Sequence, residues 1–201
     1  MAKEGQTLGL DAIAAAVKST GERGPPPVHL WNPPYCGEID MRIAADGTWF
    51  YQKTPIGRPA LVKLFASVLK READRYYLVT PVEKCGILVD EVPFIAVELR
   101  IEQTNDDAAR KGTILRFRTN VDDWVECGRD HPLRFDVEPN GGLKPFVHVR
   151  RDLWAKVTRA LYYDLVDLGE EQEVAGVPTF GVSSSGEFFP MVPAESLKGL
   201  G

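Results

Sequence analysis

The stretch GEIDMRIAADGTWFYQKTPIGRPALVKLFASVLKREADRYYLVTPVEK, residues 37–84, decides the fold, because it reads as strand, tight turn, strand, helix and strand. Apolar and polar residues alternate from Ile39 to Ile43, which is typical of a half-buried strand. Asp46-Gly47 predicts a hairpin turn, since glycine readily takes the positive φ that such turns need. Residues 48–51 then supply β-branched and aromatic side chains for the returning strand.

A helix is expected after this hairpin. Pro59 suits the first turn of a helix, where the missing N–H costs nothing. The apolar residues that follow recur at the spacing of a single helical stripe; they are Leu61, Leu64, Phe65, Val68 and Leu69. Residues 76–80 then predict a further strand. The stretch is therefore a compact α+β unit.

A second stretch with the same order of elements is LRFDVEPNGGLKPFVHVRRDLWAKVTRALYYDLVDL, residues 133–168. It begins with an alternating strand, and Asn140-Gly141 predicts the turn. Residues 146–150 predict the return strand. Residues 153–168 predict a helix with an apolar stripe, which ends before Gly169.

The two stretches suggest an internal duplication. Aligning the expected helices by their leading arginines, Arg58 and Arg151, gives an offset of 93 residues (151 − 58). This offset pairs Lys63 with Lys156, but few other identical residues support it. A chance likeness between two hairpin–helix units is the alternative, and we adopt the degenerate duplication.

Composition indicates a globular protein in a reducing compartment. The 201 residues are 44% hydrophobic and 26% charged, with a net charge of −5, which argues against a general nucleic-acid binder. Three scattered cysteines, Cys36, Cys85 and Cys127, make no disulfide framework. No apolar run has the roughly 20 residues that cross a bilayer, and the apolar residues 8–17 lack the basic lead of a signal peptide. We therefore expect a cytoplasmic protein that binds neither nucleic acid nor membrane.

The chain order predicts an α+β protein of two tandem domains that share a duplicated antiparallel hairpin-plus-helix core. The second half adds alternating strands before its helix, so it reads as an antiparallel meander closed by a C-terminal helix. A further hairpin with a Ser-Gly turn is expected in residues 177–193. The predicted parts are a helix and linker (1–24), a first domain (25–90), a second domain (91–190) and a tail (191–201).

The most suggestive chemistry is cationic. Arg58 and Arg151 fall at the expected N-termini of the two helices, with Arg150 beside the second. A helix N-terminus carries partial positive charge and free N–H groups, so arginine there favours a bound phosphate or carboxylate. The alternative is that each arginine pairs with a nearby Asp or Glu.

Other residues join this hypothesis as a ligand site. Arg118 and Arg134 are expected on outward faces of strands, where they either line a basic cleft or form cross-strand ion pairs. Asn120 offers polar recognition, although the same residue type also caps turns. Lys84, just after the first unit, is the last member of the set.

Signals for catalysis and for metal binding are weak. Cys127 and His131 lie close together in ECGRDHP, but a structural cysteine with a turn histidine is the simpler interpretation. No zinc-type or EF-hand-type spacing occurs, and Asn140-Gly141-Gly142 matches no phosphate-loop pattern. The sequence therefore predicts no catalytic residue, no metal and no resident cofactor.

The run at residues 37–84, together with LRFRTNVDD and HPLRF, closely resembles the bacterial family catalogued as domain of unknown function 1285. The likeness covers roughly residues 26–169. The resemblance implies two domains with a duplicated core, the second superficially like a pleckstrin-homology fold. It also implies a nucleotide-like ligand at the domain interface and a part in signal transduction, with no established activity and no catalytic residues.

These observations lead to one main hypothesis and two alternatives. The chain is interpreted as a non-enzymatic cytoplasmic binding module that holds a small anionic, nucleotide-based ligand between its two halves, with a role in signalling to a protein partner. One alternative is a hydrolase or transferase acting on a phosphorylated substrate, which needs a base or nucleophile in the same cleft. The other is a protein-interaction domain without a small ligand, whose surface is the aromatic–proline run around Trp31.

Overall fold

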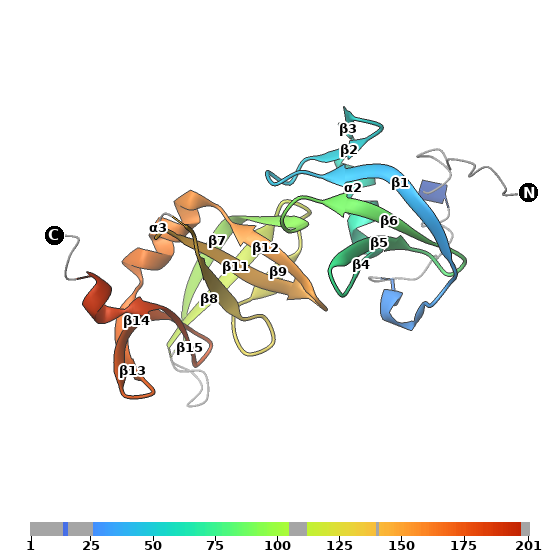
Figure 1. Ribbon diagram of the computed structural model, residues 1–201. Coiled ribbons are helices and arrows are strands. Elements are labelled where there is room, and N and C mark those ends of the chain that lie inside the picture. The colour runs from blue at the N-terminus through green and yellow to red at the C-terminus, as the bar shows by residue number, and fades with distance from the viewer. Residues whose placement is uncertain (1–13, 16–25, 105–111, 140, 198–201) are drawn as a thin grey trace, which may run out of the picture. The chain divides into compact units, whose positions relative to one another are not determined.

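The computed structural model describes residues 14–15, 26–104, 112–139 and 141–197. Contact density divides the chain into two compact units, residues 1–93 with 151–153 and residues 94–150 with 154–201. Each is built on a curled six-stranded sheet with few helices (Figure 1). The expected helix and linker of residues 1–24 lie outside the described residues, apart from the helical Ala14 and Ala15.

Between residues 26 and 93, the first domain holds six strands and one α-helix of nine residues, with a short 3-10 helix before them. Its elements are η1 (Val28–Leu30), β1 (Tyr35–Ile43), β2 (Trp49–Tyr51), β3 (Thr54–Pro55), α2 (Pro59–Ser67), β4 (Leu69–Glu72), β5 (Arg75–Val79) and β6 (Lys84–Val89). The strand order is β3-β2-β1-β6-β5-β4. Only the central pair, β1 and β6, is parallel among the pairings of this sheet.

The predicted turn and helix of the first domain are confirmed. Asp46 and Gly47 connect β1 to β2, with Gly47 at φ 82° and the Asp46 carboxylate accepting from Thr48 N at 2.9 Å. Helix α2 buries Phe65, whose ring stacks on Trp49 with centroids 6.4 Å apart. The helix ends earlier than predicted, because Leu69 turns into β4 and pairs with Leu78.

In its described residues, the second domain holds nine strands in two sheets, one α-helix and a short 3-10 helix. Its elements are β7 (Phe94–Thr104), β8 (Gly112–Thr119), β9 (Trp124–Glu126), β10 (Leu133–Val137), β11 (Leu143–Arg150), β12 (Leu153–Val157), α3 (Arg159–Asp167), β13 (Glu170–Val174), β14 (Val177–Ser184), β15 (Glu187–Pro193) and η2 (Ala194–Leu197). The large sheet runs β10-β11-β12-β7-β8-β9, and the small one β13-β14-β15. The Ser-Gly hairpin is confirmed: Ser185 and Gly186 join β14 to β15 at φ 51° and 80°.

The two large sheets have the same topology. Each sheet consists of two groups of three strands that are consecutive in the chain. The first and the last strand of the sheet in chain order pair in parallel and so join the two groups. These pairs are β1 with β6 and β7 with β12. The domains differ in their helices, because α2 lies between the two groups in the first domain whereas α3 follows both groups in the second. The likeness of the domains is therefore one of strand order.

The predicted register of the duplication is wrong. The offset of 93 residues pairs Lys63 in α2 with Lys156 in β12. Equivalent strands instead start 59 residues apart for β1 and β7 (35 and 94) and 69 apart for β6 and β12 (84 and 153).

The predicted helix over residues 153–168 starts six residues too early. Leu153, Ala155 and Val157 are 0%, 0% and 4% exposed and alternate with half-buried residues, which is the period of a strand. They form β12, and the helix begins only at Arg159. Since Arg151 lies in the turn before β12, with φ 52°, its predicted place at a helix N-terminus is wrong as well.

A buried serine ties the small sheet to the large one. Ser184 is fully buried; its hydroxyl donates to the Cys127 carbonyl at 2.6 Å and accepts from Leu115 N at 2.9 Å. Ser185 N also donates to the Thr113 carbonyl at 3.0 Å. These bonds hold the end of β14 against β8. Nowhere in the described residues is a helix long and apolar enough to cross a membrane.

Candidate functional site

One hollow in the second domain lies where three elements meet. It has a volume of about 460 Å³ and is lined from the β10–β11 hairpin, the end of β12 and the start of α3. We call it the α3 groove. Its polar and aromatic lining residues are Glu138, Lys144, Lys156, Thr158, Arg159, Tyr162 and Tyr163.

Local structure explains why three cations reach the α3 groove. Lys156 points away from the core because its neighbours Ala155 and Val157 are the buried positions of β12. Arg159 is the first residue of α3. Lys144 comes from the start of β11, and its ammonium lies 3.2 Å from the Glu138 carboxylate. Three positive side chains against one carboxylate leave the lining with an excess of positive charge.

The N-terminus of α3 adds donors to the same hollow. Thr158 is the N-cap residue, and its side chain makes no capping hydrogen bond. The first bond of the helix runs from Tyr162 N to the Thr158 carbonyl at 3.0 Å. The N–H groups of the preceding turn have no partner within the helix and carry the positive end of its dipole. An anion in the groove would be attracted by these free N–H groups and by the positive end of the helix dipole.

Two tyrosines form the aromatic side of the α3 groove. Their ring centroids lie 6.0 Å apart at 42°. The Tyr163 hydroxyl accepts from Arg159 Nε at 3.0 Å, and the guanidinium lies 5.6 Å from the centre of that ring. Burial raises the pKa of Tyr162, so this phenol stays protonated at neutral pH. The groove therefore offers neutral rings beside its cations.

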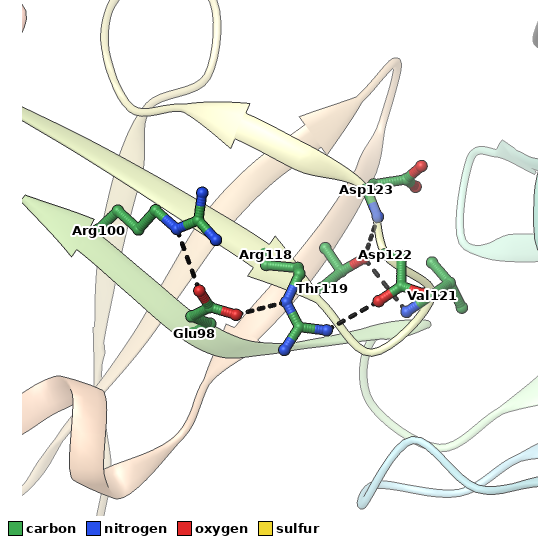
Figure 2. A network of polar contacts seen from close by, with 7 residues as sticks. All are labelled: Glu98, Arg100, Arg118, Thr119, Val121, Asp122 and Asp123. Carbon is green, nitrogen blue, oxygen red and sulfur yellow. Dashed lines mark hydrogen bonds and ion pairs between the residues drawn. The ribbon is translucent and has the colours of Figure 1, made fainter.

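Three of the predicted ligand residues, Arg118, Asn120 and Arg150, meet around the β8–β9 turn (Figure 2 shows Arg118 and its partners). Arg118 donates to Glu98 at 2.6 Å and to Asp122 at 2.8 Å. The bond to Glu98 raises the pKa of Arg118 and lowers that of the Glu98 carboxyl. These charges already have partners of opposite sign.

The other two residues at this turn also make structural contacts. Asn120 Oδ1 accepts from Ile95 N at 3.0 Å, and its own N–H donates to the Ile95 carbonyl at 2.8 Å, which clips the turn to β7. Arg150 pairs with Asp123 and lies 4.9 Å from the centre of the Phe94 ring. The arrangement holds β7, β8 and β11 together.

Arg134 lies on β10, at the opposite edge of the large sheet from the β8–β9 turn. Its guanidinium stacks between Phe146 and Trp154, at 4.9 Å and 4.6 Å from the ring centres, and bonds Asp136 at 2.9 Å. The carboxylate partner lies on the same strand, so Arg134 forms an ion pair within β10, and its contacts to other strands are with aromatic rings.

The remaining predicted residues belong to the first unit. Arg58 is the N-cap residue of α2, as predicted, and is exposed. Lys84 bonds Glu72 at 2.8 Å and lies 5.0 Å from the centre of the Tyr77 ring. The seven predicted residues are thus divided between the two units.

Nucleophilic chemistry at Cys127 finds no support. The thiol is fully buried, and burial raises its pKa to about 12, so almost none is thiolate at neutral pH. His131 Nδ1 is engaged with the His148 carbonyl at 3.2 Å. Within the described ranges, no three His, Cys, Asp or Glu side chains are grouped to hold a metal ion.

Sequence reasoning missed Lys144, Lys156 and Arg159 as a group, because the helix was expected to begin at Leu153. A signal was present. Thr158 is a preferred N-cap residue, and the strand period of residues 153–157 ends just before it. Placing the helix start there would have put Arg159 in its first turn.

Comparison with known proteins places this fold in a family. The first domain matches the model described as Domain of unknown function (DUF1285), N-terminal domain, over residues 26–92. The second matches Protein of unknown function (DUF1285), C-terminal domain, over residues 93–191. No curated protein matches the chain.

Two solved structures are similar. A DUF1285 family protein from Silicibacter pomeroyi DSS-3 is 50% identical with a TM-score of 0.81, over 94% of this chain and 98% of that one. Another, from Shewanella baltica OS155, is 27% identical with a TM-score of 0.49, over 64% of this chain and 91% of that one. With both family models covering the folded part, the chain belongs to the DUF1285 family.

Proposed function

We propose that this protein is a non-enzymatic module that binds a small anionic, nucleotide-based ligand in the α3 groove of its second domain. In this proposal the bound state is read by a protein partner, which gives the module a role in signalling. We also infer that β7–β12 followed by α3 is a pleckstrin-homology-like arrangement, since strand meanders there precede a single helix. No catalytic residue is part of the proposal.

One observation carries the proposal: three cations from three elements line the same hollow at a helix N-terminus. Lys144, Lys156 and Arg159 come from β11, β12 and α3, so the groove exists only in the folded domain. Positive side chains beside first-turn N–H groups are the usual means by which proteins bind phosphate.

The size and the aromatic wall favour a ligand with a ring. A volume of about 460 Å³ lies in the lower part of the range of small-molecule pockets, roughly 300–1,000 Å³. Tyr162 and Tyr163 supply flat apolar surface beside the cations, and such rings stack on planar groups at offset geometry. A nucleotide offers a phosphate for the cations of the groove and a nucleobase for its tyrosine rings.

The test is calorimetric titration of the full chain with nucleoside mono- and diphosphates, nucleosides and inorganic phosphate. We expect a nucleotide to bind more tightly than its nucleoside or phosphate alone. Lys156→Gln should weaken binding about tenfold or more, because a charge-assisted hydrogen bond contributes roughly 1.5–3 kcal/mol. Arg159→Gln should act in the same direction.

The matched control is Arg129→Gln, which removes an exposed arginine of the same domain that does not line the groove. It should leave affinity unchanged. Equal losses in Arg129→Gln and Lys156→Gln would show a diffuse charge effect and contradict the assigned groove. Failure of every phosphate compound to bind would contradict the function itself.

A protein-interaction surface remains the alternative because of one exposed segment. Leu30 is 72% exposed in η1, directly before Trp31. Tyr35 follows at 48% exposure. Capture of a defined partner that Leu30→Ser abolishes, with no nucleotide bound by the chain, would favour this second function.

A further inference from the structure

A second hollow lies on the small sheet of the second domain, and the function proposed above does not involve it. It has a volume of about 330 Å³ and is lined by residues of β13, β14, β15 and the start of β8. We call it the β13 groove. Its side chains are Thr113, Glu170, Gln172, Ser183 and Phe188.

Strand register explains why these side chains share one face. Paired residues of neighbouring antiparallel strands point to the same side of a sheet. The pairs are Glu170 with Gly181, Gln172 with Thr179, and Ser183 with Phe188. Glu171 and Glu173 alternate with Glu170 and Gln172, so they point to the other side.

Gly181 sets the position of the Phe188 ring. A Cβ built on Gly181 would lie 2.6 Å from Cζ of that ring, so the ring lies across the bare backbone of β14. The same Cβ would also overlap the Phe189 carbonyl oxygen. Because Glu170 is directly opposite Gly181 in the ladder, the aromatic surface lies next to its carboxylate.

A hydrogen-bond network orients the carboxylate. The Ser183 hydroxyl donates to Glu170 Oε1, and Gln172 Nε2 donates to the same oxygen at 2.9 Å and to Ser183 Oγ at 3.2 Å. Both donors reach one oxygen, and within the described residues no hydrogen bond to Oε2 is seen. The seven lining residues that the structure describes include this one acid and no Lys, Arg or His.

We propose that the β13 groove binds the alkylammonium group of a small organic cation. The ammonium would lie against the face of Phe188 and beside Glu170 Oε2, so that the ring quadrupole and the carboxylate both attract it. An anion would be repelled by the Glu170 carboxylate, and none of the described lining residues is a cation that could offset this repulsion. A neutral ligand would gain from the ring but nothing from the charge.

This site is independent of the α3 groove, which has lining of the opposite charge and shares no residue with it. Either proposal can fail while the other holds. The ligand class here is defined by the chemistry of one carboxylate and one aromatic face.

The test uses choline and its neutral isostere 3,3-dimethyl-1-butanol, titrated into the full chain and followed by ¹H–¹⁵N amide spectra. Choline should shift the amide signals of residues 170–172 and 183–188. The dissociation constant of the alcohol should be at least five times that of choline. Glu170→Gln and Phe188→Leu should each weaken choline binding about fivefold or more, because each variant removes one of the two groups that attract the cation.

The matched control is Glu171→Gln, which makes the same charge change one residue along the strand but on the opposite face. It should leave choline binding within twofold of the parent chain. Equal binding of the alcohol, equal loss in Glu171→Gln, or no shift at these residues in the parent chain would each overturn the proposal. If Phe188→Leu fails to fold, Phe188→Tyr keeps the ring and should bind choline as the parent does.

Discussion

At the scale of single residues, two of the arginines predicted to bind a ligand make contacts within the second domain instead. Arg118 bonds two carboxylates, and Arg134 lies between two rings. Residue type and outward position could be predicted from the sequence for both. Their partners could not, because Glu98 lies 20 residues from Arg118 and reaches it only through the β7–β8 ladder.

An added methyl group at Gly181 should be costly, because the nearest atom is a backbone oxygen. Gly181→Ala would place a Cβ against the Phe189 carbonyl and the Phe188 ring, and overpacking of this kind costs about 1–3 kcal/mol. Gly57→Ala is the control, since nothing lies within 4 Å of its Cβ position. Urea unfolding should show a clear loss for the first variant and almost none for the second. Equal stability of the two would contradict the packing of β14 on β15.

The Glu72 carboxyl should make the stability of the first domain depend on acid pH. Hydrogen bonds from Lys84 and Lys70 lower its pKa below the ordinary 4.5. A carboxyl with a lowered folded pKa stabilises the fold above its unfolded pKa and loses that contribution as pH falls through the folded value. Unfolding followed from pH 6 down to pH 3 should therefore show a steeper loss for the parent chain than for Glu72→Gln. Parallel curves would contradict the assignment.

At the scale of elements, the sequence predicted local units well and their ends poorly. The Asp46-Gly47 turn, the strand around Ile43 and helix α2 follow from turn residues and spacing, which act locally. The secondary structure of residues 153–157 could not be predicted in this way, because their apolar positions fit both a helix stripe and a strand. Pairing of β12 with β7, more than 50 residues earlier in the chain, settles the choice in favour of a strand.

Thr158 gives a test in which stability and binding move in opposite directions. Thr158→Asp would put a negative N-cap on α3 and should stabilise the fold by about 0.5–1 kcal/mol. The same carboxylate would enter the α3 groove and should weaken phosphate binding at least tenfold. Thr158→Ala, the control, should change stability by less than about 0.5 kcal/mol, because the native hydroxyl makes no capping bond. Tighter binding in the aspartate variant would contradict the anion site.

At the scale of the whole molecule, the two domains repeat one strand order with different helices. The sequence predicted two domains and a repeat, but it aligned the repeat on helices when the shared feature is the parallel joining of β1 to β6 and of β7 to β12. Parallel pairing between distant strands leaves no local pattern in the chain, so it could not be predicted from spacing.

The reactivity of the three cysteines tests whether the cores of both domains are closed. Cys36 is exposed, whereas Cys85 and Cys127 are buried and have pKa values raised by burial to about 11 and about 12. A thiol reagent should therefore modify one cysteine quickly in the native protein and all three after denaturation. Fast reaction of two or three thiols in the native state would show that one of the cores is open.

The central claim is that the α3 groove binds a phosphate-bearing ligand, and amide NMR tests it most directly. Titration of the ¹⁵N-labelled full chain with nucleoside phosphates should shift the signals of Lys156 and of residues 159–163, with shifts that saturate and that Lys156→Gln weakens. Saturable shifts confined to the N-terminus of α2 around Arg58, or none at all, would contradict it.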